Sequence, residues 1–120
     1  MKYYITLFIL FFSLETKAMS GNGFITICDA NKTQSADFIC MAYLQAGIDS
    51  VLNGQKTYQS FSEEIRKAIA KKMPVSCMPN IETNQAKMIL MKWYRDHPDK
   101  LDNYAISEII PALQYSFPCK

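Results

Sequence analysis

Four cysteines that follow an export signal constrain this chain more than any other feature. Cys28 and Cys40 lie early in the sequence, Cys77 lies further along, and Cys119 is the penultimate residue. In a short exported protein an even number of cysteines indicates disulfide bonds, because compartments outside the cytoplasm are oxidising. There is no CxxC pair, so zinc is disfavoured and we predict neither a metal site nor a cofactor.

The cysteines also predict where the fold is stapled, although three connectivities are open to four cysteines. We favour Cys28 with Cys40 and Cys77 with Cys119, because each pair would join neighbouring segments. In the chain-entropy model the two closures contribute about 3 and about 4 kcal/mol. That is a large share of the stability of a marginal domain.

Residues 1–18 have the pattern of a signal peptide. Lys2 supplies the positive charge, residues 4–12 form an apolar run broken only by one threonine, and cleavage is predicted after Ala18. The run has about half of the roughly 20 residues that a membrane anchor requires. We therefore predict export and cleavage, no stable membrane insertion afterwards, and a mature domain at residues 19–120.

The mature chain has the size of one domain. Removing the leader from 120 residues leaves roughly 100, which bury somewhat more than about 60% of their unfolded surface. The formal net charge of +2 is too small to attract nucleic acid or an anionic membrane in bulk. No nucleic-acid partner is predicted.

Apolar spacing predicts an all-α fold, a small disulfide-stapled bundle of about four to five helices. One helix is predicted from Asp37 to Asn53, where Asn53 and Gly54 supply a stop signal. Within it Gly47 either permits close approach of another helix or marks a local break. Residues 24–28 are predicted to belong to a short first helix. The core-facing stripe of the main helix comprises Cys40, Leu44, Gly47, Ile48 and Val51.

A second amphipathic helix is predicted to start at the capping box from Ser60 to Glu63. Glu63 and Lys67 form an i,i+4 pair on its outer face, and Lys71 suits the C-terminal end of the helix dipole. The helix ends before Pro74, because the residue before a proline is pushed out of the helical region. Its apolar stripe comprises Phe61, Ile65, Ala68 and Ile69.

Two further helices complete the pattern. The first begins near Thr83 and is closed by Pro98. The second is capped by Asp102 or Asn103 and contains Pro111, which should kink it. Their apolar stripes comprise Ala86, Ile89, Leu90, Trp93, Tyr94 and His97 in the first, and Ala105, Ile109, Ala112, Leu113 and Phe117 in the second.

The segment from Val75 to Met78 is short, lies between Pro74 and Pro79, and is pinned by a predicted disulfide. We interpret it as a rigid, partly apolar projection suited to entering a cleft in a partner. The alternative is an ordinary connection between helices whose Met78 packs into the core, and the residues leave both open. Tyr58, predicted between two helices, is the aromatic residue most suited to anchor a partner.

Catalytic motifs are missing from the sequence. No glycine-rich phosphate loop, HExxH or EF-hand spacing occurs. His97 is the only histidine, and as a general base it would need a nucleophile or an ordered water. Its place at the end of a helix favours packing beside Trp93 or bonding of the terminal carbonyls. We predict that the protein is not an enzyme.

An ordered series of short motifs covers most of the mature chain. The series comprises CMAYLQAGID at 40–49, CMP at 77–79, Gln85, HP at 97–98, AL at 112–113 and FPC at 117–119. In this order and spacing it resembles the Tai-type immunity proteins of type VI secretion systems. The strongest likeness is to the antagonists of the fourth group of type VI amidase effectors.

The resemblance implies a periplasmic, all-helical, disulfide-bonded homodimer that binds a peptidoglycan-cleaving cysteine amidase, two immunity chains with two effectors. A loop plugs the groove of the amidase and blocks it sterically. By motif, the effector-binding loop would comprise Val75, Ser76, Met78, Pro79 and Asn80. A helix of the neighbouring subunit adds contacts, and exposure assigns this second surface to Glu63, Glu64, Lys67 and Lys71.

The main alternative is a periplasmic carrier of a small molecule or lipid, with two disulfides holding a bundle around an apolar cavity. Its support is the methionine content, because methionine lines adaptable pockets. The residues concerned are Met41, Met73, Met78, Met88 and Met91. A hydrolase that uses His97 is the least favoured interpretation.

Overall fold

The computed structural model describes residues 19–29 and 33–119, so the predicted signal peptide and its cleavage after Ala18 lie outside the described residues. The described part is all-α, as predicted, with no strand. None of its helices is long and apolar enough to span a membrane. The elements are α2 (Gly21–Cys28), α3 (Gln34–Ser60), α4 (Glu63–Ala70), α5 (Thr83–Asp96), the 3-10 turn η1 (Pro98–Lys100) and α6 (Ala105–Ser116).

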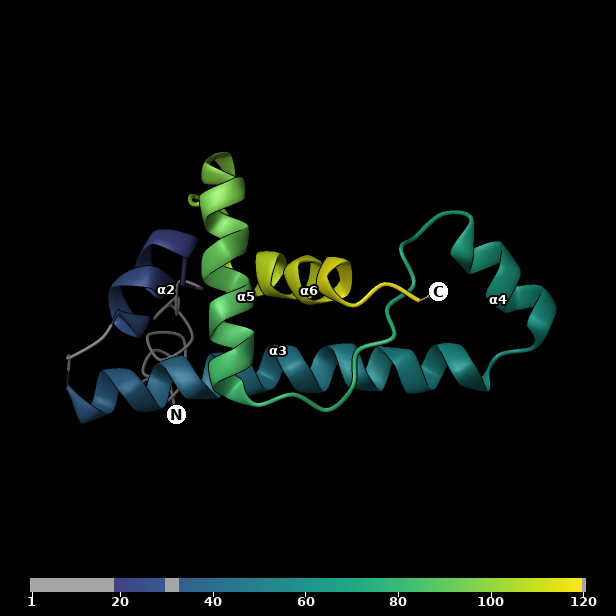
Figure 1. Cartoon of the computed structure of the whole chain (residues 1–120), viewed down its shortest axis with the longest axis horizontal. Coiled ribbons are helices and arrows are strands. Elements are labelled where there is room, and N and C mark those ends of the chain that lie inside the picture. The colour runs from purple at the N-terminus through teal and green to yellow at the C-terminus, as the bar shows by residue number, and fades with distance from the viewer. Residues whose placement is uncertain (1–18, 30–32, 120) are drawn as a thin grey trace, which may run out of the picture.

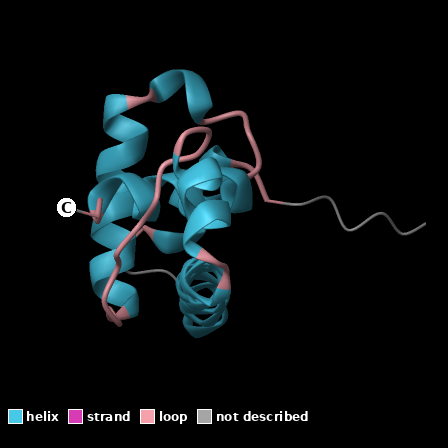
Figure 2. Ribbon diagram, turned by 90° about the vertical axis from the view of Figure 1, so that its right-hand side faces the viewer, coloured by secondary structure: helices cyan, strands magenta, loops and turns pink. Residues whose placement is uncertain are grey.

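The long helix α3 is the axis of the fold. In Figure 1 it runs along the longest dimension, with α5 crossing it and α6 lying alongside, while α2 sits near one end. Figure 2 looks along α3 and shows the other helices gathered on one side of it. Helix α4 stands apart, above the far end of α3.

The core lies where α2, α3, α5 and α6 meet. Every residue of the predicted α3 stripe is buried. Gly47 permits close approach and does not break the helix, because a Cβ there would lie 2.5 Å from Cδ1 of Ile109 on α6. The largest fully buried side chains are Phe24, Leu44, Ile48, Leu90, Ile109, Leu113 and Cys40.

Both favoured disulfides are present. Cys28 and Cys40 join α2 to α3 with their Cα atoms 5.2 Å apart. Cys77 and Cys119 join the segment after α4 to the C-terminal tail, with Cα atoms 4.9 Å apart. The predicted short first helix is also confirmed as α2. The first disulfide thus joins a short helix to the longest one, and the second joins two segments that lie outside the helices.

The predicted stop at Asn53 and Gly54 is wrong, because α3 continues to Ser60. Gly54 is exposed and costs the helix only roughly 1 kcal/mol. The extra turns have partners elsewhere in the chain, since Gln55 bonds to the backbone of Met78. Tyr58 consequently lies within α3 and is half-buried, not in an open connection.

The predicted capping box is wrong by two residues. Ser60 is the last residue of α3, and the N-cap of α4 is Ser62, whose Oγ accepts a hydrogen bond from the backbone N–H of Ile65 at 3.4 Å. The predicted Glu63–Lys67 ion pair is present at 3.1 Å. The predicted stripe, however, has no core to face: α4 carries no buried residue.

The start of α5 at Thr83 is as predicted, whereas the predicted cap of α6 is wrong. The N-cap position is held by Tyr104 without a side-chain bond. Asp102 instead accepts from Asn22 at 3.1 Å, and Asn103 donates to Glu108 at 3.0 Å. Both side chains therefore tie the loop to other elements. Helix α6 continues without interruption through Pro111.

Candidate binding surface

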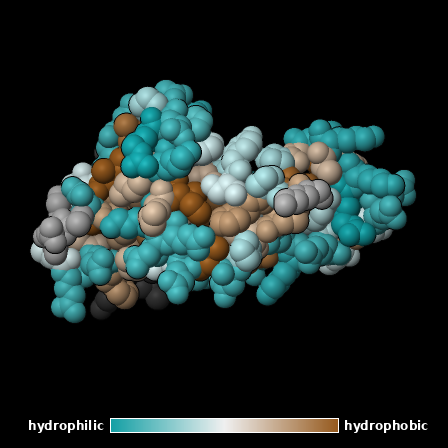
Figure 3. Space-filling model, in the orientation of Figure 1, coloured by the Kyte–Doolittle hydropathy of each residue, from teal (hydrophilic) through white to brown (hydrophobic). Residues whose placement is uncertain are grey.

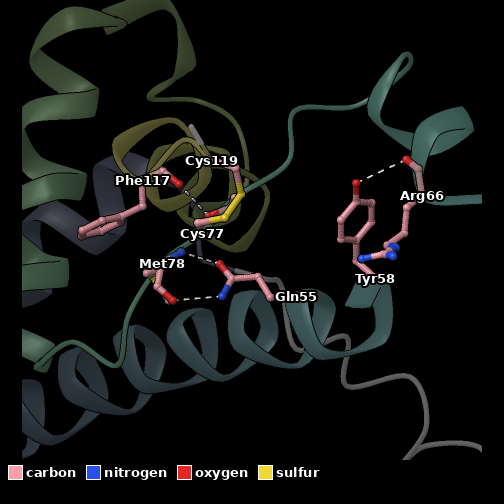
Figure 4. Close-up of a disulfide and its surroundings, with 8 residues drawn as sticks. Gln55, Tyr58, Arg66, Cys77, Met78, Phe117 and Cys119 are labelled. Carbon is pink, nitrogen blue, oxygen red and sulfur yellow. Dashed lines mark hydrogen bonds between the residues drawn. A yellow bond between two sulfur atoms is a disulfide. The ribbon is translucent and has the colours of Figure 1, made fainter. Parts of the chain in front are cut away.

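Residues 75–80, called the strap from here on, are fastened to the C-terminal tail. The backbone N–H of Cys77 donates to the carbonyl of Phe117 at 2.8 Å, and that of Cys119 donates to the carbonyl of Val75 at 3.3 Å. Figure 4 shows the Cys77–Cys119 disulfide beside the bond between Cys77 and Phe117. The strap and the tail thus pair like a short piece of antiparallel ribbon, with a bridge between Ser76 and Pro118.

The other side of the strap is held by α3 through one side chain. The amide oxygen of Gln55 accepts from the backbone N–H of Met78 at 2.7 Å, and its amide nitrogen donates to the Met78 carbonyl at 2.9 Å. Figure 4 shows Gln55 reaching from α3 to meet both groups. The strap is therefore fixed from two directions.

The side chains of the strap alternate between the inside and the outside, as expected for an extended segment. Ser76 is 7% exposed and Met78 is 3% exposed, whereas Cys77, Pro79 and Asn80 face solvent. The prediction that Ser76 and Met78 project toward a partner is therefore wrong, because both side chains are buried and Met78 packs into the core. The outer surface of the strap is formed by the alternate residues and by Asn80.

The second predicted surface lies on α4. Glu63, Glu64, Lys67 and Lys71 are all exposed, and hydrophilic side chains dominate this end of the molecule in Figure 3. One bond ties α4 back to α3: the Tyr58 hydroxyl donates to the backbone carbonyl of Arg66 at 3.3 Å (Figure 4). The acidic and basic side chains therefore project from a helix that stands clear of the core.

A shallow groove connects the start of the strap with the base of α4. Its volume is about 180 Å³. The apolar residues that line it include Tyr58, Ile69, Met73, Val75 and Ile110. Of these, Met73 is 58% exposed, and Ile65 on α4 is 48% exposed. The groove is thus bordered by the start of the strap, through Val75 and Ser76, and by Ile69 of α4.

The polar cluster between α5 and α6 is structural. His97 stacks on Trp93 with ring centroids 4.0 Å apart, and its Nδ1 lies 2.9 Å from the Trp93 carbonyl oxygen, as predicted. Glu108 is buried and accepts from Nε1 of Trp93 at 2.8 Å. Burial, and then the neighbouring Glu108, raises the pKa of Tyr94 to about 12. The described residues contain no cluster of ligands that could hold a metal ion.

The five methionines of the carrier hypothesis do not line one cavity: Met88 and Met91 share a hollow on the surface of α5, and the other three lie elsewhere. Met78 fills the core, Met41 and Met91 pack against the core, and Met73 and Met88 are 58% and 72% exposed. Met41 lies on α3, Met73 and Met78 lie in the segment between α4 and α5, and Met88 and Met91 lie on α5. Packing thus accounts for the buried ones without a ligand.

Two important residues were missed at the level of sequence. Glu108 left a signal, since an acidic residue between Ala105 and Ala112 interrupts an apolar stripe and must find buried donors. Nothing in the sequence indicated the role of Gln55, because a glutamine that follows a glycine in a predicted loop is typical of a solvated surface.

The family model for Rap1a immunity proteins matches residues 20–119 of the chain. No curated protein matches. No solved structure matches either.

Proposed function

We propose that this chain, which belongs to the Rap1a immunity protein family, is the antagonist of a type VI secreted peptidoglycan amidase. The target would be a cysteine peptidase that cleaves cell-wall peptides, delivered by sibling cells. The chain would meet it in the periplasm after loss of residues 1–18. It would act without cofactor or turnover, by occupying the active-site groove of the enzyme.

The observation that carries this proposal is the fastening of the strap. A disulfide, two backbone bonds to the tail and two bonds to Gln55 hold it in one shape. A segment that is already ordered loses little conformational entropy when it binds. Such a segment suits an inhibitor that must act on first contact.

Burial divides the strap residues into two roles. We assign effector contact to Pro79 and Asn80, which are exposed, with Val75 half-buried at the edge of the groove. Ser76 and Met78 belong to the same loop but act from inside, by holding the backbone in place. Glu63, Glu64, Lys67 and Lys71 on α4 form the second contact surface.

We also propose that the chain is a homodimer that binds two effectors. The support is the uncovered apolar surface, because side chains such as Phe38 and Tyr115 are 75% and 62% exposed. Light scattering of the mature protein, alone and with the effector, tests this stoichiometry. A monomer at high concentration in both samples would refute the dimer.

The test of function is inhibition of fourth-group type VI amidases on purified peptidoglycan by residues 19–120. We expect complete inhibition near an equimolar ratio. Asn80→Arg should abolish it, and Glu64→Arg should weaken it, while both variants keep the helical circular dichroism spectrum. Met78→Asp is unsuitable because that side chain is buried.

The matched control is Thr26→Arg, which adds the same charge at an exposed position on α2, away from the strap. It should inhibit like the wild type. If the wild type inhibits no amidase of the panel, the proposed target is wrong. If Asn80→Arg inhibits as well as Thr26→Arg, the strap does not contact the effector.

A further inference from the structure

Beyond the residues that bond to the C-terminal tail, the backbone of the strap forms its hydrogen bonds with a single side chain. The backbone groups of the strap that bond to the tail belong to Val75 and Cys77, and the Ser76 hydroxyl also donates to the tail, to the carbonyl of Phe117. The next residue, Met78, has both its N–H and its carbonyl bonded to the Gln55 amide, at 2.7 and 2.9 Å. In the described part of the chain these are the only hydrogen bonds to the backbone between Cys77 and the N-cap residue of α5, Glu82.

The Gln55 amide replaces a neighbouring strand. In an extended segment the N–H and carbonyl of one residue point to the same side, and a strand beside it would bond to both. A glutamine amide offers one acceptor and two donors in a plane, so a single side chain can make the same pair of bonds. Gln55 therefore closes an edge that would otherwise be unpaired.

The position of this pair matters because Pro79 and Asn80 follow immediately. Both are exposed, and the next buried residue is Ile81. The direction in which Pro79 and Asn80 leave the core is therefore set by Met78, whose side chain is buried and whose backbone is held by Gln55.

We infer that Gln55 is the positioning residue of the effector-binding strap: through the Met78 backbone it fixes Pro79 and Asn80 in the geometry that binds the effector. The inference rests on the proposed function. It also gives a reason for the continuation of α3 past Gly54, since a helix that stopped there would not present Gln55 to the strap.

Gln55→Glu tests the pair of bonds with almost no change in shape. A protonated carboxyl group has one donor and one acceptor and reproduces both bonds, whereas a carboxylate only accepts. The residues that line the groove beside Gln55 carry no charged side chain, so the introduced group titrates without a charged neighbour there. The variant should bind poorly when this group is ionised and recover when it is protonated.

The measurement is the Kd for a catalytically inactive amidase effector, for variant and wild type side by side from about pH 7 to about pH 4, which brackets the ordinary glutamate pKa. The ratio of the two Kd values cancels any titration of the effector. We expect the variant to bind about tenfold or more weakly near pH 7. The ratio should approach one at the acid end.

A second readout needs no effector. In Gln55→Glu near pH 7 the second carboxylate oxygen faces the Met78 carbonyl oxygen, and the repulsion between the two should force the side chain away from Met78. Amide exchange measured by NMR should then be faster at Met78, while amides in the middle of α3 keep their protection. Gln45→Glu is the matched control, because Gln45 lies on the same helix and bonds only to Asp49 on its exposed face. This control should match the wild type in both measurements.

The outcomes separate the two proposals. If the wild type binds no amidase effector, the proposed function fails and this inference fails with it. If the wild type binds and Asn80→Arg does not, but Gln55→Glu matches the wild type near pH 7, the strap is the contact and Gln55 does not position it. A loss of affinity that is equal at every pH would also overturn the role assigned to the two bonds.

Discussion

Replacing Gly47 by alanine measures how closely α3 and α6 must pack. The new methyl group would lie 2.5, 2.9 and 3.1 Å from three carbon atoms of Ile109, which is 1% exposed. Because all three atoms belong to one enclosed side chain, rotation of its terminal methyl group cannot relieve the overlap. The helices must separate or Ile109 must leave its rotamer.

Two effects of opposite sign decide the result. Alanine favours the helix over glycine by roughly 1 kcal/mol, while overpacking a filled core costs about 1–3 kcal/mol. The contacts are well below ordinary van der Waals separation, so we place the cost of overpacking in the upper part of that range. The expected net loss is about 1–2 kcal/mol, and each kcal/mol corresponds to a fall in Tm of about 4–8 °C.

The assay is urea denaturation followed by circular dichroism, with the disulfides intact. Gly54→Ala is the matched control, because it lies in the same helix and its Cβ would meet nothing within 4 Å. It should stabilise the protein by up to about 1 kcal/mol. In a double-mutant cycle, Ile109→Val should reduce the cost of Gly47→Ala, since it removes the nearest carbon. Equal stabilisation by the two alanine substitutions would refute the packing argument.

Three other perturbations test the polar cluster and the disulfide. Between pH 10 and about pH 12 the wild type should lose stability relative to Tyr94→Phe, because the pKa of Tyr94 is raised to about 12 in the fold. Below pH 10 the tyrosine is protonated in both the folded and the unfolded state, so the difference in the free energy of unfolding between the two proteins, measured by denaturation, should be constant there. Glu108→Ala should lower the free energy of unfolding by roughly 1–3 kcal/mol and alter the fluorescence of Trp93, whose Nε1–H loses its acceptor; an unchanged spectrum would contradict this. Joint replacement of Cys77 and Cys119 by serine should remove about 4 kcal/mol, and a change below about 1 kcal/mol would show that the closed loop is ordered without the disulfide.

The parts of the fold that sequence predicted correctly are those fixed by local pattern. The α3 stripe around Leu44 and Ile48 repeats at helical spacing, and a helix with one apolar side has one way to bury it. The cysteine pairs join segments that are close in sequence or terminal. Gly47 was identifiable as a close-approach position because a glycine inside an apolar stripe needs a reason.

The errors lie where a distant residue outweighs a local preference. Gly54 weakens the helix locally, but the bonds from Gln55 to Met78 depend on a segment more than 20 residues away. A prediction made from residues that are near each other in sequence cannot include these two bonds. The cap of α4 moved from Ser60 to Ser62 for the same reason, since α3 extends through Ser60 and leaves the later serine to begin the next helix.

The strap links the stability of the core to the surface that meets the effector. One extended backbone carries both its buried residues, Ser76 and Met78, and its exposed residues, Pro79 and Asn80. A movement of either pair therefore moves the other. Changes at the outward positions should therefore alter contact and act mainly on the dissociation rate. Changes at Gln55, which leave the outward side chains intact, should lower the fraction of molecules with a competent strap and slow association in proportion to that fraction. Measuring both rate constants for Asn80→Arg and Gln55→Glu therefore distinguishes a residue that touches the effector from one that holds the strap in place.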